Sequence, residues 1–335
     1  MTSEKAFGGA PGLSSYAYFV NDWPQVTWAW DLPDRNLAFL NSIDPGYYEH
    51  IARTQAPLVE EDSADGQYAA ASIRLAHAQA VETLFALLGS LAQAPQAAIG
   101  WMLAYQNRDL REVVQALLAY EGLIEATPWI GGATLERLAG IVFSRTVWTD
   151  AKKASTAKSF ERLWRHWSDS LLDDGQVAEY NSFKHGSRAA LGGHTIGVGA
   201  EITPGVAAPA DQMRSLGGSA FGSTFYVPTE VCGRLHRYPR RQSRNWSVPA
   251  LVGGLDLLAM SVRNVISILR IIGGDDPAKC GFEIPMDPAA FDLPLIGTGG
   301  VTSSSFDWSL QADQIERLTK AEVLERLRMD TPSEG

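Results

Sequence analysis

The chain has 335 residues, of which 45% are hydrophobic and 20% charged, a composition that excludes a disordered protein. The formal net charge of −10 argues against a general electrostatic attraction to nucleic acid, which requires a basic surface. Cys232 and Cys280 show no metal-ligand spacing, and residues 1–12 show no apolar secretory signal. We therefore expect a reduced, cytoplasmic protein.

Residues 1–60 are expected to form an irregular arm, because glycine and proline recur along them. An aromatic patch from Trp23 to Trp30 is expected to pack on the rest of the protein. From residue 67 to residue 94 the apolar residues follow steps of three and four, which predicts a long helix. His77 lies in this apolar seam, where a histidine is more often a core residue than a ligand.

Further helices are predicted along the middle of the chain. Their expected ranges are 101–120 with a break near Asn107, 134–148, 156–172, and a helix that begins after the turn at 173–175. Thr134 is expected to cap the second of these helices, with Arg137 one turn on. Residues 194–248 contain short β-branched and aromatic segments between glycines and prolines, which predicts a β-rich insertion.

A long apolar seam returns at residues 251–272 and resembles a membrane span. It contains Asp256, Arg263, Asn264 and Arg270, which would be unfavourable in lipid, so we expect a buried helix and no membrane partner. Residues 273–335 are expected to form a loop and then an amphipathic helix at 310–329.

The predicted fold class is mainly α. A helical bundle is expected over residues 61–272, with the β-rich insertion at 194–248 lying between the helix that begins after residue 175 and the last long core helix. The arm at 1–60 and the segment at 273–335 complete the predicted domain organisation.

The densest group of chemically useful side chains lies in the helix that begins after residue 175. Asn181, His185 and Arg188 are spaced at i, i+4 and i+7, so on a helix they share one face, with Lys184 beside them. His185 could act as general acid and base, Arg188 and Lys184 could neutralise a phosphate, and Asn181 could orient it. Alternatively, the same residues hydrogen-bond a neighbouring helix, the β insertion or a partner chain.

Residues 234–244 form a second basic cluster, with five arginines and one histidine in eleven residues. Tyr238 and Trp246 flank it and could stack on a ligand. A solvated loop is the alternative interpretation of such a charge run. Three of its arginines are the expected phosphate or ligand contacts: Arg240, Arg241 and Arg244.

Other chemistries lack their sequence signatures. There is no zinc-binding motif, no Walker or Rossmann fingerprint and no Gly-x-Ser-x-Gly nucleophile elbow. His185 and His194 are separated by Gly192-Gly193 without a carboxylate placed to join them as metal ligands. We therefore predict neither a metal nor a cofactor.

The order of long helices, a turn and a polar Asn-x-x-x-His element within Tyr180–Gly186 resembles the HEPN-type helical proteins of prokaryotes. The resemblance covers residues 67–190 and, more loosely, 249–272. It implies an up-and-down helical bundle that dimerises, and its active members are metal-independent ribonucleases of toxin–antitoxin and phage-defence systems.

This chain departs from the active members of that family, which carry an arginine and, four to six residues later, a histidine on one helix. Arg188 and His194 have that spacing, but Gly192-Gly193 interrupts it. Asn181 and His185 lie where the polar helix would place such a pair, with asparagine in place of arginine.

The resemblance implies an RNA-related or defence-related function, either metal-independent RNA cleavage centred on His185 or RNA binding. The alternative is a non-enzymatic ligand-binding or protein-interaction module. We expect a homodimer formed through the apolar helices, with RNA or a protein as partner.

Overall fold

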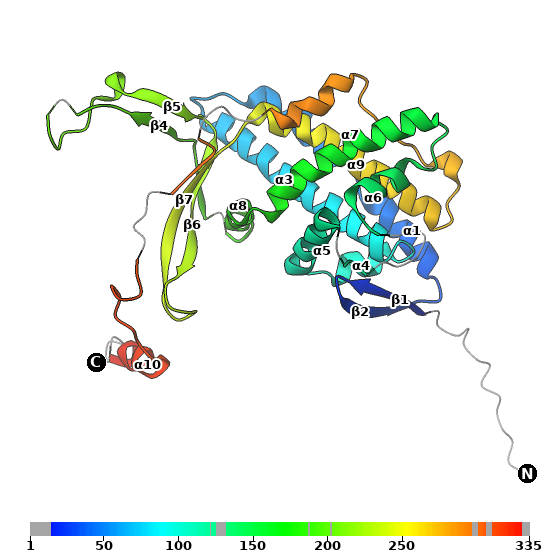
Figure 1. Cartoon of the computed structure of the whole chain (residues 1–335), viewed down its shortest axis with the longest axis horizontal. Helices are drawn as coiled ribbons and strands as arrows, with labels where there is room; N and C mark the ends of the chain where they lie inside the picture. Colours follow the sequence, from blue (N-terminus) through cyan, green and yellow to red (C-terminus); the bar gives the residue numbers. More distant parts are fainter. Residues whose placement is uncertain are drawn as a thin grey trace, which may run out of the picture. The chain divides into compact units, whose positions relative to one another are not determined.

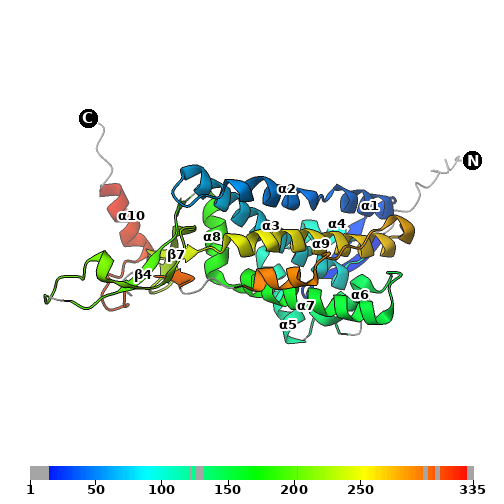
Figure 2. The ribbon, with the colours of Figure 1, turned by 90° about the horizontal axis from the view of Figure 1, so that it is seen from above.

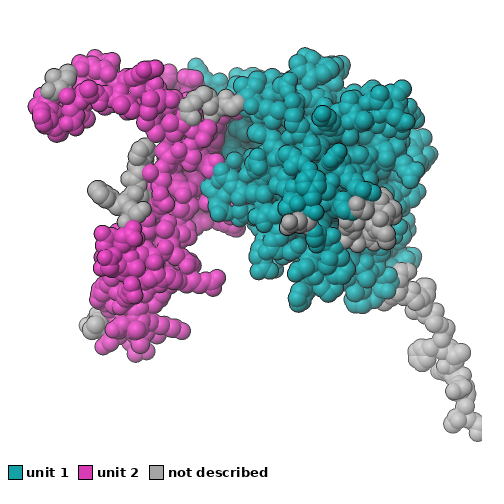
Figure 3. Space-filling model, viewed as in Figure 1, with its two compact units in different colours: residues 1–60, 64–176, 248–297 teal, residues 61–63, 177–247, 298–335 magenta. Residues whose placement is uncertain are grey.

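The computed structural model describes residues 15–120, 122–124, 132–186, 188–201, 203–296, 301–305 and 310–329, coloured along the chain in Figure 1. The first part of the predicted arm, residues 1–14, lies outside the described residues. The chain divides into two compact units (Figure 3). Unit 1 comprises Met1–Glu60, Ala64–Gln176 and Val248–Gly297, and unit 2 comprises Glu61–Ser63, Val177–Ser247 and Thr298–Gly335.

The core of unit 1 is the contact between two long helices, α3 (Ala64–Gln93) and α9 (Val248–Ile272). Both are apolar around most of their circumference, so each must be covered by other elements. Among the described helices α3 alone is long and apolar enough to cross a membrane, but 72% of its most apolar window is buried inside the protein. The apolar faces expected to form a homodimer are thus buried in unit 1, and the homodimer stays a prediction.

Shorter helices surround this pair. Figure 2 shows α1 and α2 along one side of it and α6 and α7 along the other. Their bounds are α1 (Leu32–Ser42), α2 (Gly46–Gln55), α4 (Ala98–Ala104), α5 (Asn107–Ala119), α6 (Leu135–Phe143) and α7 (Asp150–Leu172), with 3-10 turns η1 (Ala56–Leu58), η3 (Pro277–Lys279) and η4 (Pro288–Leu295). The predicted cap of α6 is confirmed, because the Thr134 hydroxyl accepts a hydrogen bond from the Arg137 N–H at 3.1 Å.

The N-terminal segment is not the irregular arm that was predicted. β1 (Ser15–Val20) and β2 (Trp23–Trp28) pair as an antiparallel hairpin (Figure 1). The two-residue turn between them begins with Asn21, whose φ of 58° lies in the left-handed region that such turns require. The aromatic patch is not buried against the rest of the protein as predicted, since Trp23, Trp28 and Trp30 remain exposed.

A single buried amide, Gln93 at the end of α3, fixes this hairpin to the core. Its Oε1 accepts hydrogen bonds from the Asn21 N–H (2.9 Å) and the Trp101 indole (3.2 Å). Its Nε2 donates to the carbonyl oxygens of Asn21 (2.7 Å) and Ile124 (2.9 Å). Both donors and both acceptor positions of the amide are therefore used, so the hairpin is held in one place.

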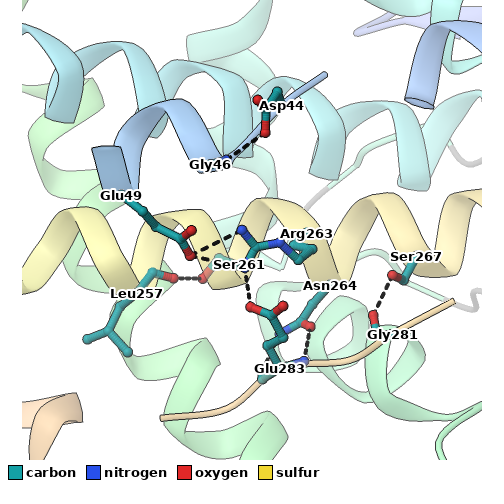
Figure 4. Close-up of polar contacts among 10 residues, drawn as sticks. All are labelled: Asp44, Gly46, Glu49, Leu257, Ser261, Arg263, Asn264, Ser267, Gly281 and Glu283. Carbon is teal, nitrogen blue, oxygen red and sulfur yellow. Dashed lines mark hydrogen bonds and ion pairs between the residues drawn. The ribbon is translucent and has the colours of Figure 1, made fainter. Parts of the chain in front are cut away.

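The loop after α9 is held to that helix by the polar network in Figure 4. Arg263 pairs with Glu49 of α2, at 3.1 Å, and with Glu283 of the loop. The Asn264 amide bonds the Glu283 backbone in both directions, at 2.7 and 2.8 Å. Arg263 and Asn264, two of the residues that argued against a membrane span, are thus paired inside unit 1.

Unit 2 contains small antiparallel sheets and helices. Its elements are α8 (Asp174–Lys184), which begins in unit 1, β3 (Ala189–Leu191), β4 (Thr195–Val198), η2 (Ala210–Gln212), β5 (Arg214–Gly218), β6 (Gly222–Glu230), β7 (Arg237–Asn245), β8 (Ser303–Ser304) and α10 (Lys320–Met329). One sheet has the strand order β3-β6-β7-β8, and β4 pairs with β5. The buried Glu179 carboxylate anchors α8 by accepting hydrogen bonds from Ser223 Oγ (2.5 Å) and the Trp246 indole (2.8 Å).

The predicted fold class, a helical bundle with one β-rich insertion, is wrong. Of the described residues 56% are helical and 16% are in strands, but the strands form three small sheets. The β1–β2 hairpin precedes the helices, and β8 comes from the segment after α9, so the strands are not confined to one insertion. Described helices range from 7 to 30 residues, and the short ones surround α3 and α9 instead of forming an up-and-down bundle.

The last helix is shorter than predicted, because α10 begins at Lys320 instead of residue 310. Thr319 and Glu322 form a reciprocal cap at its start. The Glu322 carboxylate accepts from the Thr319 N–H at 2.7 Å, and the Thr319 hydroxyl accepts from the Glu322 N–H at 3.3 Å. This Thr-x-x-Glu pattern is the sequence signal that fixes the helix start.

His77 is buried on α3, as expected for a histidine in an apolar seam. Gly254 of α9 leaves room for its ring, since a Cβ there would lie 2.9 Å from the His77 Nε2. Burial, with smaller contributions from Arg74 and His166, lowers the pKa of His77 to about 3. The imidazole is therefore neutral in the folded protein at neutral pH.

We expect His77 to make folding stability depend on pH. As the pH falls below 6.5, the ordinary pKa, the unfolded chain takes up a proton that the folded chain excludes, so stability falls by about 1.4 kcal/mol per pH unit. Denaturant unfolding of the wild type and His77→Leu, from about pH 7 to about pH 4, measures this slope. The variant should lose it, while His185→Leu should keep it; parallel curves for wild type and His77→Leu would contradict the assignment.

Candidate functional site

The predicted stripe of Asn181, His185 and Arg188 on one helical face does not form. α8 ends at Lys184, and Gly186 turns the chain with a φ of 104°. The His185 N–H still bonds the Asn181 carbonyl at 3.0 Å, but Arg188 lies beyond the turn. His185 and Arg188 are exposed and Asn181 is half-buried.

Lys184, His185 and Arg188 lie at the surface of α8 and its following turn. The Lys184 ammonium lies 5.7 Å from the centre of the Tyr180 ring, a cation–π contact on the surface of α8. The buried residues of α8 are Glu179 and Ser182 instead. Three cavities, of about 410, 430 and 230 Å³, have walls that contain no predicted residue of α8 or its following turn.

The arginine-rich run forms strand β7, not a solvated loop. It pairs with β6 over nine residue pairs, and side chains alternate between the two faces of the hairpin. Arg241 is exposed on one face, whereas Arg240 and Arg244 are half-buried on the other. The Arg240 Nε donates a hydrogen bond to Ser305 Oγ at 2.9 Å. Of the three arginines predicted to bind a ligand, only Arg241 lies on the exposed face.

Tyr226 lies directly opposite Arg241 on this exposed face. Its side chain is 59% exposed, so the hairpin presents an aromatic ring beside a guanidinium. Arg237, on the same face, is paired with Glu230 at 2.5 Å. Trp246, which was expected to stack on a ligand, is buried and hydrogen-bonded to Glu179, so its role is structural.

A cavity of about 430 Å³ lies beside this face, within unit 2. Its walls come from β4 and the residue before it, from β7 and from β8, and are formed by His194, Thr195, Ile196, Gly197, Arg241, Ser243 and Ser304. The Asn245 amide holds His194 in the wall, accepting from its N–H and donating to its carbonyl, both at 2.8 Å. The same amide donates to the Val301 carbonyl at 2.7 Å, so it links His194 to the segment that leads into β8.

The hydrogen bonds of His194 indicate which ring nitrogen carries the proton. Nε2 lies 2.9 Å from Ser304 Oγ, while Nδ1 is buried without a partner among the described residues. Burial lowers the pKa of His194, so the ring is neutral at neutral pH. Buried N–H groups are rarely left unpaired, and unpaired acceptors are tolerated more often. The favoured tautomer therefore has its proton on Nε2 and donates to Ser304.

This tautomer suits binding better than nucleophilic catalysis. A serine nucleophile must donate its O–H to an imidazole whose other N–H is held by an acceptor. His194 has no such acceptor within the described part of the chain. With Nε2–H donating, the Ser304 O–H is free to donate into the cavity, next to the Arg241 guanidinium. Two such donors match an anionic oxygen, such as that of a phosphate.

Sequence reasoning assigned no role to Tyr226 or Ser304 and noted His194 only for its spacing from Arg188 and from His185. The strand pairing that places Tyr226 beside Arg241 could be found from the alternation of residues on either side of the turn at 231–236. Ser304 reaches the cavity from a distant part of the chain, and no local pattern signals that. Among the described residues, no cluster of three or more His, Cys, Asp or Glu side chains could hold a metal ion.

Comparison with protein-family models, curated proteins and solved structures found no match. The resemblance to HEPN-type proteins stays a prediction for this reason. The function must be inferred from the chemistry of the site itself.

The tautomer of His194 can be measured directly. Long-range ¹H–¹⁵N correlation spectra at neutral pH should show a protonated Nε2 and an unprotonated Nδ1, because the buried Nδ1 has no acceptor. A Ser304→Ala variant, which removes the partner of Nε2, identifies the His194 signals. A protonated Nδ1 would mean that Ser304 donates to His194, and would favour a nucleophilic serine instead of a binding site.

Proposed function

We propose that this protein binds single-stranded RNA at the exposed face of the β6–β7 hairpin and does not cleave it. The observation that carries this proposal is the Tyr226–Arg241 pair beside a cavity lined by hydrogen-bond donors. Stacking of bases on aromatic rings and contact of phosphates with cations are the means by which proteins hold single strands. Tyr226 would stack on a base, and Arg241 and Ser304 would bind the adjoining phosphate.

The local charge of the hairpin supports this proposal despite the acidic chain. Residues 222–245 contain five arginines and one carboxylate, Glu230. The charge on this hairpin is thus opposite in sign to the net charge of −10. Because charges more than about 10 Å apart are largely screened at physiological salt, the hairpin sets the potential that a bound strand would experience.

RNA binding without cleavage is favoured over cleavage for two reasons. The exposed His185 lies on the turn after α8, where Arg188 does not share its helical face, so the pair expected to act on a scissile phosphate is not formed. His194 lies in a cavity wall, but its favoured tautomer makes it a donor to Ser304 and leaves no accessible base.

We expect Arg241→Ala and Tyr226→Ala each to weaken RNA binding by roughly tenfold, since a base stack or charged contact contributes about 1–3 kcal/mol. Fluorescence anisotropy of a labelled oligouridine, titrated at several salt concentrations, measures the affinity. Arg241→Ala should also reduce the slope of log K against log salt by about 0.7, the value for one phosphate contact on a single strand. Tyr226→Ala should leave that slope unchanged.

The matched control is Arg108→Ala, which removes an exposed arginine of unit 1 and changes the net charge equally. It should alter the affinity by less than about twofold. If it weakens binding as much as Arg241→Ala does, the interaction is unspecific. Cleavage of the RNA in EDTA that is lost in His185→Ala would contradict the proposal and favour a ribonuclease centred on His185.

A further inference from the structure

A second cavity, of about 410 Å³, lies in unit 1 beside the N-terminal hairpin. One wall comes from the end of β2 and the start of α1, and the other comes from α4. The side chains that give it its character are Trp28, Trp30, Asp31, Arg35, Ile99 and Leu103. Its volume is within the range of cavities that bind small molecules or short peptide segments.

Two exposed indole rings line this cavity. Trp28 is 62% exposed and Trp30 is 66% exposed, and the neighbouring Leu103 is also exposed. Large apolar groups gathered at a surface mark interaction sites, and tryptophan is the residue most enriched where binding energy is concentrated. Because the Gln93 amide holds the hairpin turn with two hydrogen bonds and Trp101 of α4 with a third, the cavity is formed before any ligand arrives. Binding would therefore require little ordering of the protein.

The surroundings of this cavity are acidic. Residues 27–35, which supply one wall, contain two aspartates, Asp31 and Asp34, and one basic residue, Arg35, and residues 95–107 contain no charged residue. Arg35 is paired with Asp31 at 2.6 Å, which holds the pKa of that carboxyl below its usual value. Asp34, in the first turn of α1 beside this wall, is exposed and leaves one negative charge next to the cavity. A polyanion such as RNA would be repelled here, whereas a basic ligand would be attracted.

We propose that this cavity binds a proline-rich segment of a partner protein that carries arginine or lysine beside its prolines. A polyproline II helix has no internal hydrogen bonds and is already extended, so its proline rings can pack on indole faces at low entropic cost. Its solvated carbonyls can accept hydrogen bonds from the indole N–H groups. A flanking cation matches Asp34. This inference does not depend on RNA binding, because the cavity lies entirely in unit 1.

The test uses the full chain and a fluorescein-labelled peptide of eight prolines with two arginines at each end. Anisotropy titration should show saturable binding. Trp28→Ala and Trp30→Ala should each raise the Kd at least about tenfold, the effect expected of a central aromatic contact. The matched control is Trp23→Ala, because Trp23 is 69% exposed on the same hairpin but does not line the cavity. That variant should bind within about twofold of the wild type.

Two further measurements distinguish specific peptide binding at this cavity from nonspecific adsorption and from binding at the proposed RNA site. The same peptide with glutamates in place of the arginines should bind at least about fivefold more weakly, because of the acidic surroundings. Arg241→Ala, in unit 2, should bind the arginine-flanked peptide like the wild type. The proposal is overturned if no saturable binding occurs, if a peptide with serines in place of prolines binds equally, or if Trp23→Ala loses as much affinity as Trp28→Ala.

Discussion

The contact between α3 and α9 is the constraint on which unit 1 depends. Both helices are buried around most of their surface, so neither could exist without a shell of other elements. Their few buried polar groups determine where parts of that shell attach. Gln93 at the end of α3 uses its whole amide to hold the hairpin turn and Trp101, while Arg263 and Asn264 of α9 hold the loop at Glu283.

These attachments link the core to the surface. The Gln93 and Asn264 amides are fully buried, so losing their partners would leave unpaired polar groups in an apolar interior, and these contacts oppose displacement of the hairpin and the loop. The hairpin then carries Trp28 and Trp30 at a constant position beside α4. The buried Gln93 amide needs hydrogen-bond partners in any case. The same bonds hold the hairpin beside α4, so the exposed aromatic cavity requires no additional interaction to keep its shape.

In unit 2 the corresponding constraint is the pairing of β6 with β7. The nine pairs assign every residue of the hairpin to one of two faces. On one face lie the buried Ser223 and Phe225, with Glu179 of α8 bonded to Ser223. On the other face lie Tyr226 and Arg241. A shift of one residue in this register would exchange the two faces and remove the proposed RNA-binding surface.

Much of the helical part of the fold could be predicted from the sequence. The apolar periodicity of α3, α7 and α9 reflects burial, and the cap at Thr134 is a local hydrogen bond, so both appear in the sequence. The hairpin at residues 15–28 was missed because its turn, Asn21-Asp22, was given less weight than the prolines around it. The overall architecture depends on which helices meet, and single-sequence periodicity does not encode that.

The candidate site was predicted less well, for similar reasons. Asn181, His185 and Arg188 satisfy a helical spacing, but Gly186 ends the helix before Arg188. Arg240, Arg241 and Arg244 were treated as equivalent, although strand alternation separates Arg241 from the other two. The cavity at His194 combines residues from distant parts of the chain, and only the folded structure brings them together.

The proposed RNA-binding surface is the exposed face of the β6–β7 hairpin. Photo-crosslinking of a 4-thiouridine-containing RNA to the full chain, followed by peptide mass spectrometry, tests it most directly. We expect crosslinks within residues 222–245, with Tyr226 as the principal position. Crosslinks confined to residues 177–188, around His185, would contradict it.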